Sequence, residues 1–214
     1  MSKNIRTYST NEKLVEERRS QIIRCAVKLF NKKGFDGTSM RDIAHACKMT
    51  SANIYNYIEG KDDIIRLIME GGHVRSYQFI REANEGLERL GVIEALKNAI
   101  SLFFRHIDGA RAGVTFLYRG IASFRDDIRA QVLKVEADET AVFENILHKG
   151  CASGEFEVNG ARLLADNIIS LSQMWAVKHG MLGGRYTIDE YTRVQTNSIL
   201  RQIQLNGKPD YYLK

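Results

Sequence analysis

The chain has 214 residues, a formal net charge of +5 and a hydrophobic content of 44%. These values are ordinary for a soluble globular protein with one small and one medium-sized domain. The N-terminus has no apolar signal-peptide segment, and no apolar run approaches the roughly 18 residues of a membrane helix. The sequence therefore excludes a secreted or membrane-spanning class and predicts a cytoplasmic protein.

The charge is unevenly distributed along the chain. Residues 1–61 hold 12 Lys and Arg against 6 Asp and Glu, a net charge of +6, whereas residues 62–214 hold 19 against 20, a net charge of −1. A small basic domain beside a near-neutral body is typical of a protein that binds the phosphate backbone of a nucleic acid. The alternative is a solvated basic surface without a partner.

The proline and cysteine content indicates the fold class and the redox state of the compartment. The single proline is Pro209, and so few helix breakers favour an all-helical protein. The three cysteines, Cys25, Cys47 and Cys151, include no Cys-x-x-Cys pair. They predict reduced thiols in a reducing compartment.

The first ten residues are polar, and a long helix is predicted to follow them. Lys3 and Arg6 are suited to contacts in a DNA minor groove, the alternative being a loose tail. The helix is predicted over residues 11–33, with Ser9 and Glu12 at capping-box spacing.

Two short helices around a tight turn come next. Thr38 or Ser39 caps the first helix, and Asp42 follows Ser39 by three residues, as in a capping box. Thr50 caps the second helix, which is predicted over residues 51–57. Apolar residues in both helices are spaced to pack against each other. This is helix-turn-helix geometry, in which the second helix enters the DNA major groove.

This stretch resembles a known family. The residues that carry the resemblance are Thr38, Asp42, Ile43, Ala44, Thr50, Ile54, Tyr55, Asn56, Tyr57 and Lys61. With the adjoining helices, roughly residues 16–66 are similar to the DNA-binding domain of the TetR family of bacterial transcriptional regulators. Two positions depart from the family pattern, Lys48 in place of glycine and Ile58 in place of phenylalanine. A left-handed conformation at Lys48 would cost about 1 kcal/mol.

The predicted DNA-binding residues lie in and around the second short helix. They are Thr38, Arg41, Thr50, Ser51, Ala52, Asn53, Tyr55, Asn56, Tyr57 and Lys61. By its chemistry, Asn53 can pair with adenine and Ala52 can meet a thymine methyl group. The resemblance implies that four positions hold the DNA backbone, namely Thr38, Tyr55, Tyr57 and Lys61. For each tyrosine the alternative is a half-buried packing ring.

The rest of the chain is predicted to be helical. Helices are expected near residues 61–87, 91–110, 113–124, 126–151, 160–181 and 187–206. Gly71 and Gly72 mark either a flexible point or a packing position in the first of them. The predicted fold class is all-α, with an N-terminal three-helix helix-turn-helix domain over residues 1–61. A C-terminal helical effector-binding and dimerisation domain is expected over residues 62–214.

Aromatic and methionine side chains in the middle helices suit a small-molecule cavity, although they equally suit a helical core. The resemblance implies that these helices enclose an effector site. The predicted pocket residues are Phe103, Phe104, Ile107, Tyr118, Phe143, Leu147, Met174 and Trp175. Three histidines, His106, His148 and His179, are the polar groups considered for orienting a ligand.

The last two helices carry more apolar surface than one buried face needs, and Thr187 and Glu190 form a capping box at the start of the second. The resemblance implies a four-helix dimer interface, the alternative being burial within one domain. The predicted interface residues are Leu164, Ile168, Leu171, Tyr191, Gln195 and Ile199. The phrase from Arg185 to Tyr191 resembles the tails of regulators that respond to acyl-CoA thioesters.

No enzyme motif is present: the sequence has no nucleophile elbow, phosphate-binding glycine loop or zinc-protease motif. His148 and Cys151 lie three residues apart, but two ligands make no structural metal site, and no metal or cofactor is predicted.

The predicted function is a ligand-responsive transcriptional repressor without enzymatic activity. As a homodimer it would bind a palindromic, double-stranded DNA operator and be released by a small hydrophobic or acyl-CoA-like effector. Two alternatives stay open, a helical partner-binding protein that acts without DNA and a small-molecule enzyme in the body.

Overall fold

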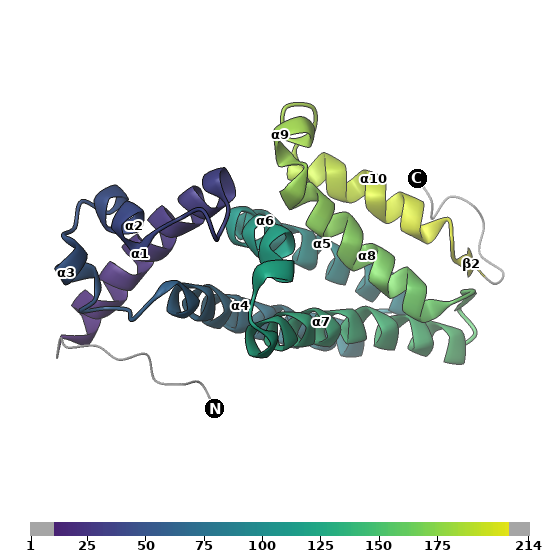
Figure 1. The fold of residues 1–214 in the computed structure, drawn as a ribbon. Helices are drawn as coiled ribbons and strands as arrows, with labels where there is room; N and C mark the ends of the chain where they lie inside the picture. The colour runs from purple at the N-terminus through teal and green to yellow at the C-terminus, as the bar shows by residue number, and fades with distance from the viewer. Residues whose placement is uncertain (1–10, 206–214) are drawn as a thin grey trace. The chain divides into compact units, whose positions relative to one another are not determined.

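The computed structural model describes residues 11–205, which form helices and one very short strand pair (Figure 1). The helices are α1 (Glu12–Lys33), α2 (Met40–Ala46), α3 (Ser51–Ile54), α4 (Lys61–Arg89), α5 (Val92–Gly109), α6 (Arg111–Gly120), the 3₁₀ helix η1 (Ile121–Ser123), α7 (Asp126–Ala152), α8 (Ala161–Val177), α9 (His179–Leu182) and α10 (Ile188–Leu200). The strands β1 (Phe156–Glu157) and β2 (Gln204–Leu205) pair antiparallel. The predicted all-α class is confirmed.

The chain divides into two compact units, each made of two segments. The N-terminal unit comprises residues 11–73 and 115–132, and the C-terminal unit comprises residues 74–114 and 133–205. The division falls within α4, whereas the predicted domain boundary falls at the first residue of that helix. The boundary after Lys61 stays a prediction.

The N-terminal unit is organised by an aromatic cluster contributed by both of its segments. Phe30 of α1 stacks on Phe116 of α6 with ring centroids 4.8 Å apart, and Phe35 meets Phe124 edge-on at 5.8 Å. Phe116 and Phe124 are themselves 5.4 Å apart. Aromatic pairs at such distances add to the free energy of area burial. The second segment is therefore part of this core.

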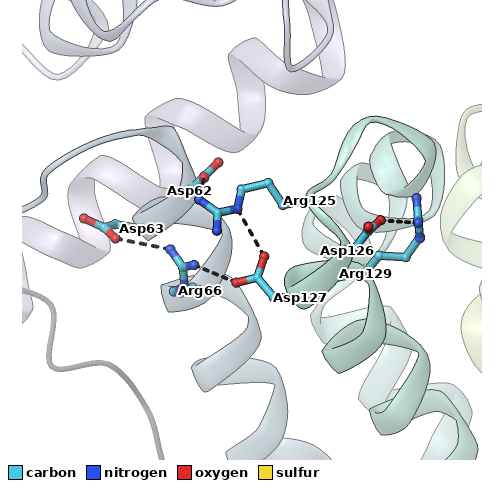
Figure 2. Close-up of polar contacts among 7 residues, drawn as sticks. All are labelled: Asp62, Asp63, Arg66, Arg125, Asp126, Asp127 and Arg129. Atoms are coloured by element: carbon cyan, nitrogen blue, oxygen red, sulfur yellow. Dashed lines mark hydrogen bonds and ion pairs between the residues drawn. The ribbon is translucent and has the colours of Figure 1, made fainter.

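Charged side chains join the first turns of α4 and α7 within the N-terminal unit, as Figure 2 shows. Arg66 lies 3.6 Å from Asp63 and 3.1 Å from Asp127. Arg125 lies 3.1 Å from Asp127 and 3.8 Å from Asp62. The acidic residues also sit in helix first turns, where the helix dipole favours negative charge. One network thus stabilises two helix starts and connects them.

The C-terminal unit has a core of its own, in which α5, α8 and α10 pack on one another (Figure 1). The helix α5 is strongly amphipathic, and it buries eight apolar side chains: Ile93, Ala95, Leu96, Ala99, Ile100, Phe103, Phe104 and Ile107. Residues from the second half of α4 and from α7 complete the core. None of the helices between residues 11 and 205 combines the length and the apolar character that a membrane span needs.

Local capping accounts for several helix starts. The capping boxes at Ser39 with Asp42 and at Thr187 with Glu190 are both present, as predicted. At α1 the cap is Asn11, whose side chain accepts a hydrogen bond from the Leu14 N–H. The predicted cap Ser9 lies outside the described residues.

Several predicted helices differ in extent or continuity from those observed. The helix expected over residues 160–181 is interrupted at Lys178, where the backbone leaves helical geometry and α9 begins. The helix expected to end at residue 206 ends at Leu200, and the chain then extends into β2. The helix that begins at Lys61 runs without interruption through Gly71 and Gly72 to Arg89.

Candidate DNA-binding interface and effector-binding core

The helix α3 presents the first candidate site. Thr50 adopts an extended conformation before it, and the Thr50 side chain accepts a hydrogen bond of 3.1 Å from the Asn53 N–H. Ser51, Ala52 and Asn53 are exposed, whereas Ile54 is fully buried against the domain core. One buried residue therefore anchors α3 and leaves its first turn open to solvent, as a base-contacting helix requires.

The α3 helix is shorter than the predicted 51–57. After Ile54 the backbone hydrogen bonds join residues three apart, as in a 3₁₀ helix. The Asn56 N–H donates to Asn53 O and the Tyr57 N–H donates to Ile54 O, both at 3.1 Å. This tightening ends the helix and turns the chain toward α4.

The turn before α3 contains a residue in the left-handed conformation. Lys48 has φ 56°, and no other described residue except glycine has a positive φ. The Met49 N–H donates to Ala44 O at 2.9 Å and so closes the end of α2. Lys48 therefore adopts a conformation that glycine adopts without strain, at a cost of about 1 kcal/mol.

The predicted phosphate-contacting residues fall into two groups. Arg41 and Tyr55 are exposed, Tyr55 by 45%. Thr38 and Tyr57 are only 1% and 7% exposed, and the Thr38 hydroxyl donates to Gly34 O at 2.8 Å. For Tyr57 the structure thus favours packing over a surface role, and Thr38 likewise serves the interior. The residue types alone gave no sign of this difference.

Lys61 already has partners within the domain. Its ammonium group donates to Phe35 O at 2.6 Å and lies 4.4 Å from the centroid of the Phe35 ring. The ammonium has three N–H donors, so a phosphate contact would be additional to these. Asn56 is exposed, and its side-chain amide donates to the Asn53 side chain at 3.4 Å. The DNA contacts of all ten predicted residues stay a prediction.

Two side chains of α1 hold the helix-turn-helix segment by its backbone. Arg19 donates from Nε to Tyr57 O at 3.1 Å, and Gln21 donates from Nε2 to Cys47 O at 2.8 Å. Sequence reasoning missed both residues, because polar positions on an amphipathic helix are typical of a solvated face. Their contacts fix the ends of the two short helices relative to α1.

Titratable groups in this unit stabilise structure. The Ser39 hydroxyl and backbone N–H, aided by Lys33, lower the pKa of Asp42 to about 2. Burial, with Cys25 nearby, raises the pKa of the Cys47 thiol to about 12. Cys47 is therefore a protonated packing residue, since only a thiolate is reactive.

Most of the predicted pocket residues meet in the core of the C-terminal unit. Those buried there are Phe103, Phe104, Ile107, Phe143, Leu147 and Trp175. Met174 is partly buried on α8. Tyr118 is 49% exposed and belongs to the N-terminal unit, so the structure does not place it in this core. An effector role for these residues stays a prediction.

A polar pair lies inside this apolar core. His106 Nε2 is 3.7 Å from Glu139 Oε1, and His106 also stacks near Phe79 and Phe103. Burial raises the pKa of Glu139 to about 7, although a hydrogen bond from Ser76 opposes the shift. Burial also lowers the pKa of His106 to about 4. Both groups are neutral between those values and could offer a hydrogen bond to a ligand.

The other two candidate histidines differ from His106. The side chain of His148 is 64% exposed and lies near Glu144. His179 packs edge-on against Trp175 at 4.9 Å, and its Nδ1 is buried without a hydrogen-bond partner among residues 11–205. Glu139 could not be found from sequence, because Glu136 and Asp138 beside it suggest a solvated helix face.

The predicted dimer-interface residues mostly face inward. Leu164, Ile168, Tyr191 and Ile199 are buried in the core of their own unit, with exposures of at most 7%. Leu171 and Gln195 are partly buried. The apolar stripe that suggested an interface is the inner face of each helix, and other apolar side chains lie outward: Leu163, Tyr186 and Val194.

Comparisons with known proteins agree with this architecture. Residues 22–68 match the model of the bacterial regulatory proteins of the tetR family, and residues 90–203 match the model of a tetracyclin repressor-like C-terminal domain. The HTH-type transcriptional regulator HbdR of Aromatoleum sp. (strain CIB) is 30% identical over 190 residues, which cover 89% of this chain and 82% of HbdR.

Solved structures share the fold. AibR, crystallised in complex with isovaleryl coenzyme A and operator DNA, matches with a TM-score of 0.69 and 20% identity over 85% of this chain and 97% of its own. FadR from Bacillus subtilis, in complex with stearoyl-CoA, matches with a TM-score of 0.61 and 23% identity over 89% and 99%.

The two matched family models cover both the helix-turn-helix segment and most of the helical body. Members of this family are transcriptional regulators and not enzymes, which confirms the predicted class of function. The chain belongs to the TetR family of bacterial transcriptional regulators.

Proposed function

We propose that this regulator is a cytoplasmic homodimer that represses transcription from a palindromic operator and is released by a small hydrophobic or acyl-CoA effector. The observation that carries the proposal is the exposed first turn of α3, held in place by the Thr50 cap and the buried Ile54. A two-fold dimer would present two such helices about 34–36 Å apart, which matches one turn of DNA.

The assignment of roles follows from chemistry and exposure. Asn53 carries an amide suited to adenine, and Ala52 carries a methyl group suited to thymine. Arg41 and Tyr55 are exposed donors for phosphate oxygens. Contacts of the first kind specify sequence, whereas contacts of the second kind provide affinity for any duplex.

The effector proposal is supported by similarity. AibR and FadR, which share this fold, were crystallised with acyl-CoA molecules. In this chain the apolar core around Phe103 and Phe143, with the polar pair His106 and Glu139, offers matching chemistry for an acyl chain and its polar end. An effector that prefers one arrangement of the dimer shifts the equilibrium away from the DNA-bound one.

The DNA proposal is tested by selecting bound duplexes from a random pool and measuring affinity at several salt concentrations. Asn53→Ala should relax preference at one base pair, by about 1–3 kcal/mol of discrimination, whereas Tyr55→Ala should weaken binding to all duplexes. Asn84→Ala, at an exposed position of α4, is the control and should change neither. If wild-type protein binds no duplex in a salt-dependent way, a partner-binding protein is favoured instead.

The effector proposal needs a separate measurement. Acyl-CoA thioesters of increasing chain length, with free coenzyme A as the reference, are added to the protein–operator complex. Release by one range of chain lengths supports the proposal, and unchanged binding with every thioester contradicts it.

A further inference from the structure

The outer surface of the C-terminal unit has a polar groove between α5 and α10. Its volume is ≈ 520 Å³, and every lining side chain is polar or charged. Lys97, Ser101 and Arg105 follow one face of α5 at spacings of four residues, and Arg193 and Asn197 do the same on α10. The groove is distinct from the apolar core that the proposed effector site uses.

The groove carries an excess of positive charge. Three of its lining residues are cationic and one, Asp189, is acidic. Arg105 pairs with Asp189 at 3.0 Å, and Lys97 pairs with Glu94 at 2.8 Å. Arg193 has no ion-pair partner within 4 Å among residues 11–205. Besides the hydrogen bonds from Thr187, its charge helps to lower the pKa of Glu190, but the guanidinium group is held by no ion pair of that length and can still donate to an anion.

A buried hydroxyl points to the same conclusion independently. Thr192 lines the groove and is only 8% exposed, and its Oγ1 is shielded from solvent without a hydrogen-bond partner in the described structure. Buried polar atoms of this kind are rare in native proteins and call for an explanation, such as an unoccupied ligand position. A ligand oxygen would satisfy this hydroxyl once the side chains that shield Oγ1 move aside.

We infer that the α5–α10 groove binds the phosphate groups of a small-molecule ligand. Guanidinium, ammonium, hydroxyl and amide groups all supply donors, and phosphate oxygens supply acceptors only. The volume exceeds what a lone carboxylate fills, which favours a diphosphate or a nucleotide. The inference adds to the proposed function a site for the phosphate-bearing part of an effector, and it predicts phosphate binding that does not require DNA.

Two residues of the aromatic core are sequence neighbours of residues that line the groove. Phe104 and Tyr191 immediately precede Arg105 and Thr192 in the sequence, and their rings are 5.9 Å apart. Tyr191 in turn lies 5.0 Å from Trp175. Trp175 is the single tryptophan of the chain, so its fluorescence provides a signal from the core beside Tyr191.

The test is direct binding of inorganic diphosphate, ADP and free coenzyme A, measured by calorimetry and by Trp175 fluorescence in the absence of DNA. Wild-type protein should bind at least one of them saturably. Arg193→Gln should weaken that binding about tenfold, because it removes charge-assisted hydrogen bonds. Thr192→Val, which keeps the shape and removes only an unpartnered hydroxyl, should weaken binding while the protein stays folded.

Arg81→Gln is the matched control, because Arg81 is an exposed arginine of the same unit and does not line the groove. The inference is overturned if wild type binds none of the three probes at millimolar concentration, or if the Arg81 and Arg193 variants bind equally. It is also overturned if Arg193→Gln alters only the oligomeric state, which would assign the groove to a contact between copies.

Comparing the affinities of the three probes identifies which class of phosphate-bearing ligand the groove prefers. Equal binding of ADP and coenzyme A indicates a nucleotide site, and tighter binding of coenzyme A indicates that the site also recognises the part of coenzyme A beyond its nucleotide. Operator binding is measured on the same variants to separate the two proposals. If an acyl-CoA releases the operator equally well from wild type and from Arg193→Gln, the groove is not the effector site and the proposed function stands. If the protein binds phosphate compounds but no duplex, the groove inference stands and the proposed function is wrong.

Discussion

The two compact units use polar side chains in opposite ways. In the N-terminal unit the informative polar groups lie at the surface, as helix caps or as donors to backbone carbonyls, and the interior is apolar and aromatic. The C-terminal unit places His106 and Glu139 among the rings of its core. The first arrangement suits the proposed contact with a large rigid partner, and the second suits the proposed binding of a small effector.

The largest expected effect is on the free energy of unfolding, and it tests which segments belong to the core of the N-terminal unit. Phe116→Ala removes a ring that packs on Phe30 in the N-terminal unit, although it comes from a helix distant in sequence from the DNA-binding segment. We expect a loss of about 3–5 kcal/mol in the free energy of unfolding. Hydrogen exchange should show the loss of protection first in α1 and α2.

Phe103→Ala is the counterpart in the other core, where Phe103 is fully buried. It should expose α5 and α8 to exchange first. If both variants lose protection in the same helices, the division into two units is wrong.

The next largest effect is the pH dependence of the free energy of unfolding, which depends on the buried pair His106 and Glu139. The ordinary pKa of glutamate is 4.5 and that of Glu139 is raised to about 7, so the folded state holds a proton that the unfolded state releases between those values. The free energy of unfolding should therefore fall as pH rises from 4.5 to 7, by about 3 kcal/mol at most. Glu139→Gln removes this titration.

Denaturant unfolding of wild type and of Glu139→Gln at pH 5 and pH 8 checks the expectation. The variant should gain stability relative to wild type at the higher pH, and all other titrating groups cancel in the comparison. The same pH dependence in both proteins would contradict a raised pKa at Glu139.

The smallest effect concerns the turn between α2 and α3. Lys48→Gly removes the steric strain at φ 56° but raises the entropy of the unfolded chain, so a net gain of about 0.5 kcal/mol is expected. Lys28→Gly, at an exposed position inside α1, should instead lose about 1 kcal/mol. Losses of equal size in thermal unfolding would show that Lys48 is not strained.

The contrast between the units also explains what could be predicted from sequence. The caps at Ser39, Thr50 and Thr187 depend on residues within a few positions of each other, and all three were predicted. Local rules of this kind operate wherever the rest of the chain lies.

Sequence reasoning is least informative where the answer depends on which distant segment covers a helix. Tyr57 and Ile199 carry the same side chains whether they face solvent, a partner or their own core, and only the packed structure shows that both are buried. Glu139 escaped notice for the same reason, because its acidic neighbours give no sign that this one carboxyl points inward. Hydrophobic periodicity identifies the apolar face of a helix, but it does not identify which segment packs against that face.

The two-segment construction of the N-terminal unit has a consequence for recombining such regulators. A fragment cut after α3 would lack Phe116, Phe124 and Ile128, and it would leave the rings of Phe30 and Phe35 uncovered. Exposed apolar patches of that kind promote aggregation. A chimera that combines this DNA specificity with another effector domain should therefore carry residues 115–132 together with the helix-turn-helix. The sequence between these two segments would then come from the other protein.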